Sequence, residues 1–258
     1  MTRIAAFSDI HGNRLALEAV RKAVDAARPD YVAICGDLVF NGPDPAGALA
    51  LVQELERAGA FVIVGNTDIA VADGDFTAAF PWFSDGAPDS YRVAAEWARD
   101  QIGDDGVDYL RRLPWERRLR VDDGSSFGDG SPFGDLVVFC HASPGSLTDG
   151  LMADLDPVVT IERVSPTDAK VIVCGHTHLP EVREIGWRTL VNDGSAGYVF
   201  DGDPTASWAL IEIEEGTVHA EIRRAAYDTL AASDAVSARG LPGDVYRAAT
   251  IRTGKLVR

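Results

Sequence analysis

Two residues that could chelate a metal ion stand one residue apart near the start of the chain, in the stretch SDIHGN at residues 8–13. Asp9 supplies a carboxylate and His11 an imidazole, and the apolar residues before them are typical of a strand. Side chains of an extended chain alternate sides, so those of Asp9 and His11 point the same way. The pair is half of a candidate chelate, and the other half must come from elsewhere in the chain.

Further polar residues follow four later apolar runs, each of strand length. The stretches that carry them read GDLVFNG, GNTD, CHASPG and CGHTH. Ligands of an open α/β sheet bind outside the carboxyl ends of its strands, so we expect one rim to collect all these side chains. The expected metal ligands are Asp9, His11, Asp37, Asn66, His141, His176 and His178.

The chemistry of this set favours transition metals, because imidazoles, carboxylates and one amide oxygen suit ions such as Mn, Fe, Zn and Ni. Seven ligands are too many for one tetrahedral ion. They suit two divalent cations that lie roughly 3.5–4 Å apart and share a carboxylate. Asp37 is the expected bridge, because each of its oxygens can bind one cation. Each motif alone is also typical of an ordinary turn, and only their joint occurrence indicates a site.

The pattern of apolar residues predicts an α/β protein whose parallel strands alternate with helices. Strands are expected at 3–7, 31–34, 61–64, 136–140, 171–174 and 188–191, helices at 14–27 and 46–58, and a hairpin over 207–224. We expect one domain over 1–258. Within it, the aromatic-rich segment of about 73–121 is expected to form a helical cap-like insertion. A Gly/Ser/Asp-rich loop of about 122–135 is expected to be flexible.

Composition narrows the classes of partner. The formal charge is −16, which disfavours broad nucleic-acid binding by bulk charge. No apolar run is long enough to cross a bilayer and the start of the chain lacks the pattern of a secretory signal, so we expect a cytoplasmic protein without a membrane partner. The three cysteines are widely spaced and are expected to be buried hydrophobic residues. The oligomeric state cannot be inferred from the sequence.

Together these motifs resemble the signature of calcineurin-like metallophosphoesterases over residues 1–200, and most closely their small bacterial and archaeal phosphodiesterase-like branch. The resemblance implies a four-layer α/β/β/α sandwich, in which two mixed sheets are flanked by helices. It places one metal on Asp9, His11, Asp37 and His178, and the other on Asp37, Asn66, His141 and His176. The implied reaction is in-line attack of a metal-activated hydroxide on the phosphorus of a small phosphate ester. Asn66 would stabilise phosphoryl charge.

One position departs from the signature, because Thr67 stands where many relatives have a histidine that protonates the leaving oxygen. A hydroxyl is a poor acid at pH 7, although His176 could substitute for it. The departure favours phosphodiesterase activity, with manganese among the candidate metals. Phosphomonoester, nucleotide or protein phosphatase activity is the alternative within enzymes. A non-catalytic protein-binding scaffold, like a retromer subunit of the same fold, is the alternative outside them.

Two residues beside the expected metal ligands are candidates for binding substrate. Thr67 could do so through its hydroxyl. Asn13 could touch substrate or cap the helix that begins at Arg14.

Overall fold

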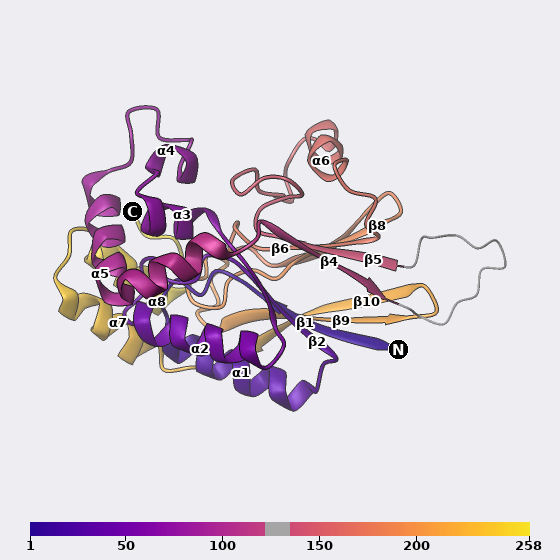
Figure 1. Ribbon diagram of the computed structural model, residues 1–258, viewed down its shortest axis with the longest axis horizontal. Coiled ribbons are helices and arrows are strands. Elements are labelled where there is room, and N and C mark those ends of the chain that lie inside the picture. The colour runs from indigo at the N-terminus through magenta and orange to yellow at the C-terminus, as the bar shows by residue number, and fades with distance from the viewer. Residues whose placement is uncertain (122–134) are drawn as a thin grey trace.

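The computed structural model describes residues 1–121 and 135–258, and its strands form two mixed five-stranded sheets that face each other (Figure 1). The first sheet has the order β10-β9-β1-β2-β3, and the second has the order β4-β5-β6-β8-β7. The strands of the first sheet are β1 (Thr2–Phe7), β2 (Tyr31–Cys35), β3 (Phe61–Ile63), β9 (Ala206–Glu214) and β10 (Thr217–Ala225). Those of the second are β4 (Glu116–Val121), β5 (Asp135–Cys140), β6 (Val171–Cys174), β7 (Glu181–Ile185) and β8 (Arg188–Asn192).

Each sheet combines parallel and antiparallel strands. In the first, β1, β2 and β3 run parallel, β9 pairs antiparallel with β1, and β10 pairs antiparallel with β9 at the edge. In the second, β5, β6 and β8 run parallel, with β4 and β7 antiparallel at the edges. Helices α1 (Arg14–Ala27) and α2 (Pro45–Arg57) cover the first sheet, and α6 (Pro157–Val164) covers the second. The predicted four-layer sandwich is therefore confirmed.

The alternation of side chains explains why both faces of each sheet are apolar. In β6, Val171 and Val173 face the core between the sheets, whereas Ile172 and Cys174 face the core under α6. A strand buried on both faces reads as a continuous apolar run, as VIVC does. The cysteines follow the same rule: Cys35, Cys140 and Cys174 are all buried and free.

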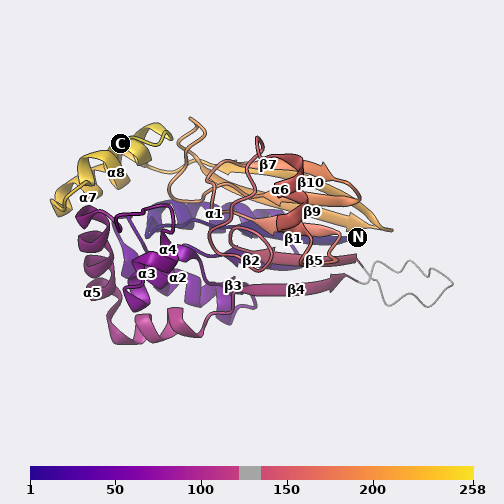
Figure 2. The same cartoon turned by 90° about the horizontal axis from the view of Figure 1, so that it is seen from above.

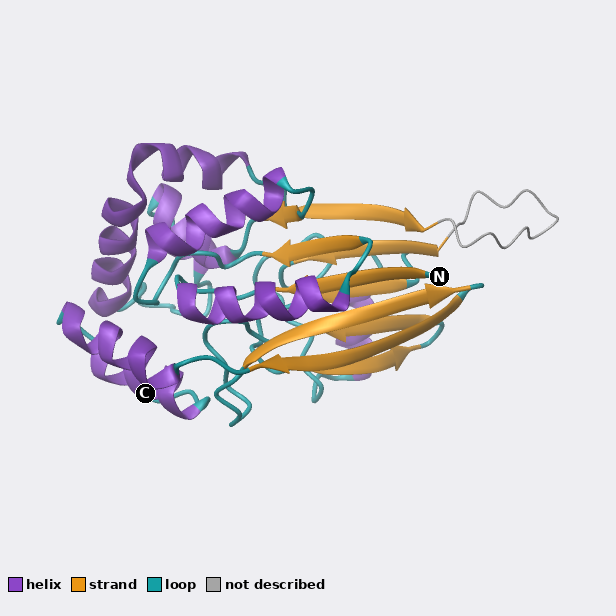
Figure 3. Ribbon diagram, turned by 90° about the horizontal axis from the view of Figure 1, so that it is seen from below, coloured by secondary structure: helices purple, strands orange, loops and turns teal. Residues whose placement is uncertain are grey.

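The remaining helices gather at the carboxyl ends of the parallel strands, opposite the N-terminus (Figures 2 and 3). They are α3 (Asn66–Asp73), α4 (Phe76–Ala79), α5 (Asp89–Arg112), α7 (Thr229–Arg239) and α8 (Asp244–Thr253). Helix α5 contains a kink at Gly103, whose φ of 64° interrupts the helix.

The segment of about 73–121, predicted as a helical cap-like insertion, is helical only in part. Its helical part ends at Arg112, and residues 116–121 form an edge strand of the second sheet. The sequence of this strand, ERRLRV, does not resemble a buried strand, because most of its residues are charged, and half of them are exposed. Strand β7 was also not predicted. The flexible loop predicted at about 122–135 lies almost wholly outside the described residues. Within the described ranges, no helix is both long and apolar enough to cross a membrane.

The core between the sheets generates a first prediction. Phe139 is fully buried there and lies against Phe61, with ring centroids 6.0 Å apart. Phe139→Ala should lower the free energy of unfolding by about 3–5 kcal/mol, because it leaves a cavity between two sheets. Trp187→Ala, at a ring that is 58 % exposed, is the control and should change it by less than about 1 kcal/mol. Urea unfolding measures both, and equal losses would contradict this account of the core.

Candidate metal centre

The structure brings all seven predicted metal ligands to one place at the carboxyl ends of five parallel strands. Asp9 and His11 follow β1, and Asp37 follows β2. The others occupy the same position on later strands: Asn66 after β3, His141 after β5, and His176 and His178 after β6. The fifth histidine, His219, lies on β10, away from this end of the sheets.

One group of four side chains forms a compact cluster. The ligand atoms of Asp9, His11, Asp37 and His178 all lie within 4.8 Å of one another, and all four residues are buried. The Nε2 atoms of His11 and His178 are 3.2 Å apart. His178 Nε2 lies 3.2 Å from Asp9 Oδ1, and His11 Nε2 lies 3.5 Å from Asp37 Oδ2.

A second group lies on the other side of Asp37. Asn66 Oδ1 is 2.8 Å from His141 Nε2 and 3.0 Å from His176 Nδ1. His141 Nε2 is 3.4 Å from Asp37 Oδ1. The two oxygens of Asp37 thus face different groups, which is the arrangement that a bridging carboxylate requires.

Three imidazoles are oriented by the backbone. Nδ1 of His11 lies 3.0 Å from Phe40 O, Nδ1 of His141 lies 2.8 Å from Cys35 O, and Nδ1 of His178 contacts Tyr198 O. A carbonyl oxygen only accepts, so each Nδ1 carries a proton, and in the neutral ring each Nε2 presents a lone pair to the site. Such a second contact is typical of metal-binding histidines.

The side chain of Asn66 is oriented in a similar way. Its Nδ2 donates to Ala79 O at 2.8 Å, which turns Oδ1 toward the histidines. Asp9 uses Oδ2 to accept from the backbone N–H of His176, at 2.8 Å. Its Oδ1 is buried and accepts no hydrogen bond from the described residues. Lone pairs that converge without donors fit cations, so this donor set fits the implied metals.

The backbone is strained where these ligands stand. Eight non-glycine residues of the described ranges have positive φ, and five of them are predicted ligands. Their φ values fall between 51° and 66°: Asp9, His11, Asp37, His176 and His178. Such conformations cost about 1–3 kcal/mol each and cluster at functional sites.

The charges of the site support the same assignment. Burial opposes ionisation of Asp9, but His178 and His11 hold the pKa of its carboxyl well below the usual range. Burial and the neighbouring His141 lower the pKa of His176 to about 4. His176 is therefore neutral at pH 7, which favours a ligand over a proton donor. Burial lowers the pKa of His141, but Asp37 and Asp9 outweigh it and the net shift is upward.

A buried acidic residue, Asp193, supports the carboxylate of Asp9 through the hydroxyl of Ser8. Ser8 Oγ contacts Asp9 Oδ2 and lies 2.5 Å from Asp193 Oδ1, yet a hydroxyl has only one proton to donate. Burial raises the pKa of Asp193 well above its usual range. A protonated Asp193 therefore donates to Ser8, and Ser8 donates to Asp9. Asp193 lies in the stretch NDGS at residues 192–195 and is not among the predicted site residues, because only the fold brings it next to Ser8.

The side chain of Asp68 stabilises the loop that carries Asp37. Its carboxyl accepts from the backbone N–H groups of Gly65, Asp37 and Leu38 at 2.8–3.0 Å. Burial and the neighbouring Asp37 raise its pKa to about 7.

The two predicted substrate residues have different surroundings. Asn13 is buried, accepts from Ala16 N at 3.2 Å and donates to Gly197 O at 2.9 Å. These contacts make it the cap of α1, and it does not line the cavity over the metal centre. Thr67 does line that cavity, and its Oγ1 has no hydrogen-bond partner among the described residues.

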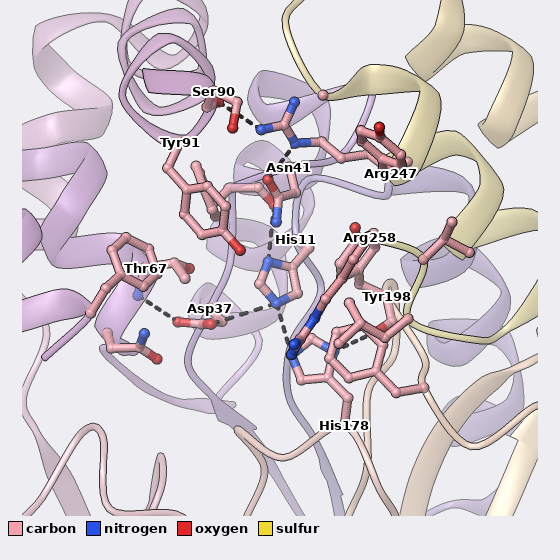
Figure 4. Close-up of a pocket in the computed structure, with 18 of the residues that line it drawn as sticks. His11, Asp37, Asn41, Thr67, Ser90, Tyr91, His178, Tyr198, Arg247 and Arg258 are labelled. Carbon is pink, nitrogen blue, oxygen red and sulfur yellow. Dashed lines mark hydrogen bonds and ion pairs between the residues drawn. The ribbon is translucent and has the colours of Figure 1, made fainter. Parts of the chain in front are cut away.

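The cavity has a volume of about 520 Å³ and is lined by residues of both groups. Figure 4 shows some of its lining residues. Most of its wall was not predicted as part of the site. Aromatic rings form much of it: Phe40, Phe80, Trp82, Phe83, Tyr91, Tyr198, Phe200 and Tyr246. Two arginines from the last part of the chain, Arg247 and Arg258, also line it. The motif loops lack such arginines, and only folding could place these two.

The contact between the Ser8 hydroxyl and the Asp9 carboxylate generates a second prediction. Ser8→Ala removes the hydroxyl that orients this carboxylate and should weaken Mn²⁺ binding by about 10-fold. Ser237→Ala is the control, because Ser237 lies on α7 and donates to Ser233 O within the same helix. Calorimetric titration of metal-free protein measures both affinities. Unchanged affinity in Ser8→Ala would show that Asp9 needs no support from Ser8.

Comparisons with known proteins agree with this geometry. A crystal structure of a metallophosphoesterase from Sphaerobacter thermophilus is 26 % identical, with a TM-score of 0.71 over 98 % of this chain and 99 % of that one. A hypothetical protein from Pyrococcus horikoshii shares the fold at 20 % identity, with a TM-score of 0.81 over the same shares of the two chains. An uncharacterized protein of Methanocaldococcus jannaschii is 26 % identical over 93 % of both chains. The calcineurin-like phosphoesterase superfamily domain matches residues 2–216, and the chain belongs to this superfamily of hydrolases that act on phosphoric esters.

Proposed function

We propose that the protein is a metal-dependent phosphodiesterase whose seven-ligand set holds two divalent cations. Asp37 would hold both, because its two oxygens face the two groups of ligands. The cations would supply a nucleophile from water at neutral pH and stabilise charge on the phosphoryl oxygens. Manganese, iron, zinc and nickel all suit these ligands, and manganese is the ion to test first.

The observation that carries the preference for diesters is Thr67. It lines the cavity, and its backbone N–H donates to Asp37 Oδ1 at 2.9 Å. A threonine hydroxyl does not release a proton at pH 7, and His176 is neutral there. A poor leaving group therefore lacks a protonated side chain to assist it at these two positions. A diester with a good leaving group needs less assistance.

The contacts of Asn66 favour metal binding over a purely catalytic role. One N–H of its amide donates a hydrogen bond to Ala79 O, and its oxygen faces His141 and His176. A role in stabilising the phosphoryl oxygens would need its remaining N–H. The chain's own contribution at this position is thus to hold Oδ1 in place.

The test compares bis(p-nitrophenyl) phosphate with p-nitrophenyl phosphate after metal is removed and then restored as Mn²⁺, Zn²⁺ or Ni²⁺. We expect turnover of the diester to exceed that of the monoester and to vanish with chelator. Asp37→Asn and His141→Ala should each lower kcat/KM by about 10³-fold, because metal stabilisation of the transition state is worth several kcal/mol.

His219→Ala is the control for these variants, because it removes an exposed histidine on β10. It should keep full activity. Metal content is measured on the same samples. Two metals per chain without turnover of either ester would favour a protein-binding scaffold, and a dominant monoesterase activity would favour the phosphatase alternative.

A substitution at position 67 tests the argument about the leaving group. Thr67→His would place an imidazole next to Asp37 and should raise the ratio of monoester to diester turnover by about 10²-fold, the usual contribution of a general acid. Thr67→Val, which removes only the hydroxyl, should leave the ratio unchanged. A ratio that moves with valine but not with histidine would refute the argument.

A further inference from the structure

The cavity is bounded on one side by a buried cluster of three charged residues on α7 and α8. Asp244 accepts from Arg239 at 2.6 Å and from Arg247 at 3.1 Å. All three side chains are at most 6 % exposed. Two guanidinium groups share one carboxylate, so the cluster keeps one net positive charge. A buried charge without a counter-ion is unfavourable, and an anionic ligand would offset it.

Arg247 is the member of this cluster that lines the cavity, and its position is fixed by four hydrogen bonds. Besides Asp244, it donates to Pro242 O at 2.7 Å, to Ser90 O at 2.7 Å and to Asn41 Oδ1 at 2.9 Å. A guanidinium group has five N–H donors, so one of them is left over. The leftover donor belongs to Nη2.

The contact with Arg247 also fixes the side chain of Asn41. An arginine only donates, so the oxygen of the Asn41 amide must be the atom that faces it. Its Nδ2 then lies on the opposite side, as Figure 4 shows, with Arg247 beyond one end of the amide and His11 beyond the other. Asn41 lines the cavity, and within the described ranges Nδ2 makes no hydrogen bond.

The rest of the lining favours an anionic ligand with a flat organic part. In a chain of net charge −16, the lining residues drawn from the described ranges include one carboxylate side chain, that of Asp37. Trp82 and Tyr246 line this cavity, and the two residues are 54 % and 49 % exposed. Exposed rings of this kind can stack on an aromatic group.

Resting on the proposed function, we propose that Asn41 and Arg247 form a second subsite, which binds a phosphate that the substrate carries in addition to the scissile one. Asn41 Nδ2 donates to this phosphate, and Arg247 supplies the charge. Arg247 is also a positioning residue, because it holds the amide of Asn41 in the donating orientation. The preferred substrates are phosphate esters with an aromatic organic part and a second phosphate.

The test measures binding of two ligands that differ by one phosphate, thymidine 5′-phosphate and thymidine 3′,5′-bisphosphate, by calorimetry in the presence and absence of Mn²⁺. The wild-type protein should bind the bisphosphate at least 10-fold more tightly. Asn41→Asp keeps an acceptor for Arg247 but replaces the donor with a negative charge. It should bring the ratio of the two affinities close to one while the melting temperature is maintained.

Gln101→Glu is the matched control, because it makes the same amide-to-carboxylate change at an exposed position of α5 and should keep the wild-type ratio. Equal wild-type affinities, failure of both ligands to bind, or an Asn41→Asp ratio like that of the wild type would each overturn the subsite. Hydrolysis of bis(p-nitrophenyl) phosphate by the same samples tests the proposed function separately. Its absence would overturn that function, whereas the affinity ratio alone decides whether the subsite exists.

Discussion

The metal centre depends on a set of hydrogen bonds in which three of the four histidine ligands are held by an atom of the main chain. Nδ1 of His11, His141 and His178 each faces a carbonyl oxygen from another segment of the chain. Each contact fixes a tautomer, and the fixed tautomer is what turns Nε2 inward. The position of each of these three ligands is thereby tied to the position of a neighbouring segment. Strained φ values at five of the ligands are tolerated because the two sheets hold those loops rigidly.

The sandwich supplies that rigidity from both sides. Asp9 and Asp37 come from the first sheet, whereas His141 and His178 come from the second, so the site exists only where the two sheets face each other. The core between the sheets sets their separation. Ser8 and Asp193 reinforce the contact between the two sheets, since they join the end of β1 to the segment after β8 through a buried hydrogen bond.

The sequence allowed the parallel strands of both sheets and the set of ligands to be predicted for a physical reason. Buried parallel strands read as continuous apolar runs, and polar residues directly after them must lie at the carboxyl rim. The edge strand β4 was not predicted, because its arginines and glutamate resemble a surface helix or loop. The cap of α1 by Asn13 needed the structure, since capping and substrate binding require the same amide.

Most of the wall of the cavity could not be predicted from the sequence. Arg247 is more than 200 residues from Asn41 in the chain, and their contact depends on how α8 docks against the end of the sheets. Neither residue type nor spacing carries such information. The aromatic residues between α3 and α5 are evident in the sequence, but only the fold shows which of them line the cavity.

The alternation of side chains at the end of strand β5 also decides whether a nitrogen or a sulfur atom faces the metal centre. Cys140 and His141 are adjacent, yet the thiol is buried under α6 while the imidazole faces the centre. Burial raises the pKa of the Cys140, Cys35 and Cys174 thiols, so none of them offers a thiolate. A slip of one residue in β5 would exchange His141 for a sulfur ligand and favour soft ions such as Cu(I). The register of this strand therefore acts as a filter on metal identity, by turning the sulfur of Cys140 away from a centre built from nitrogen and oxygen.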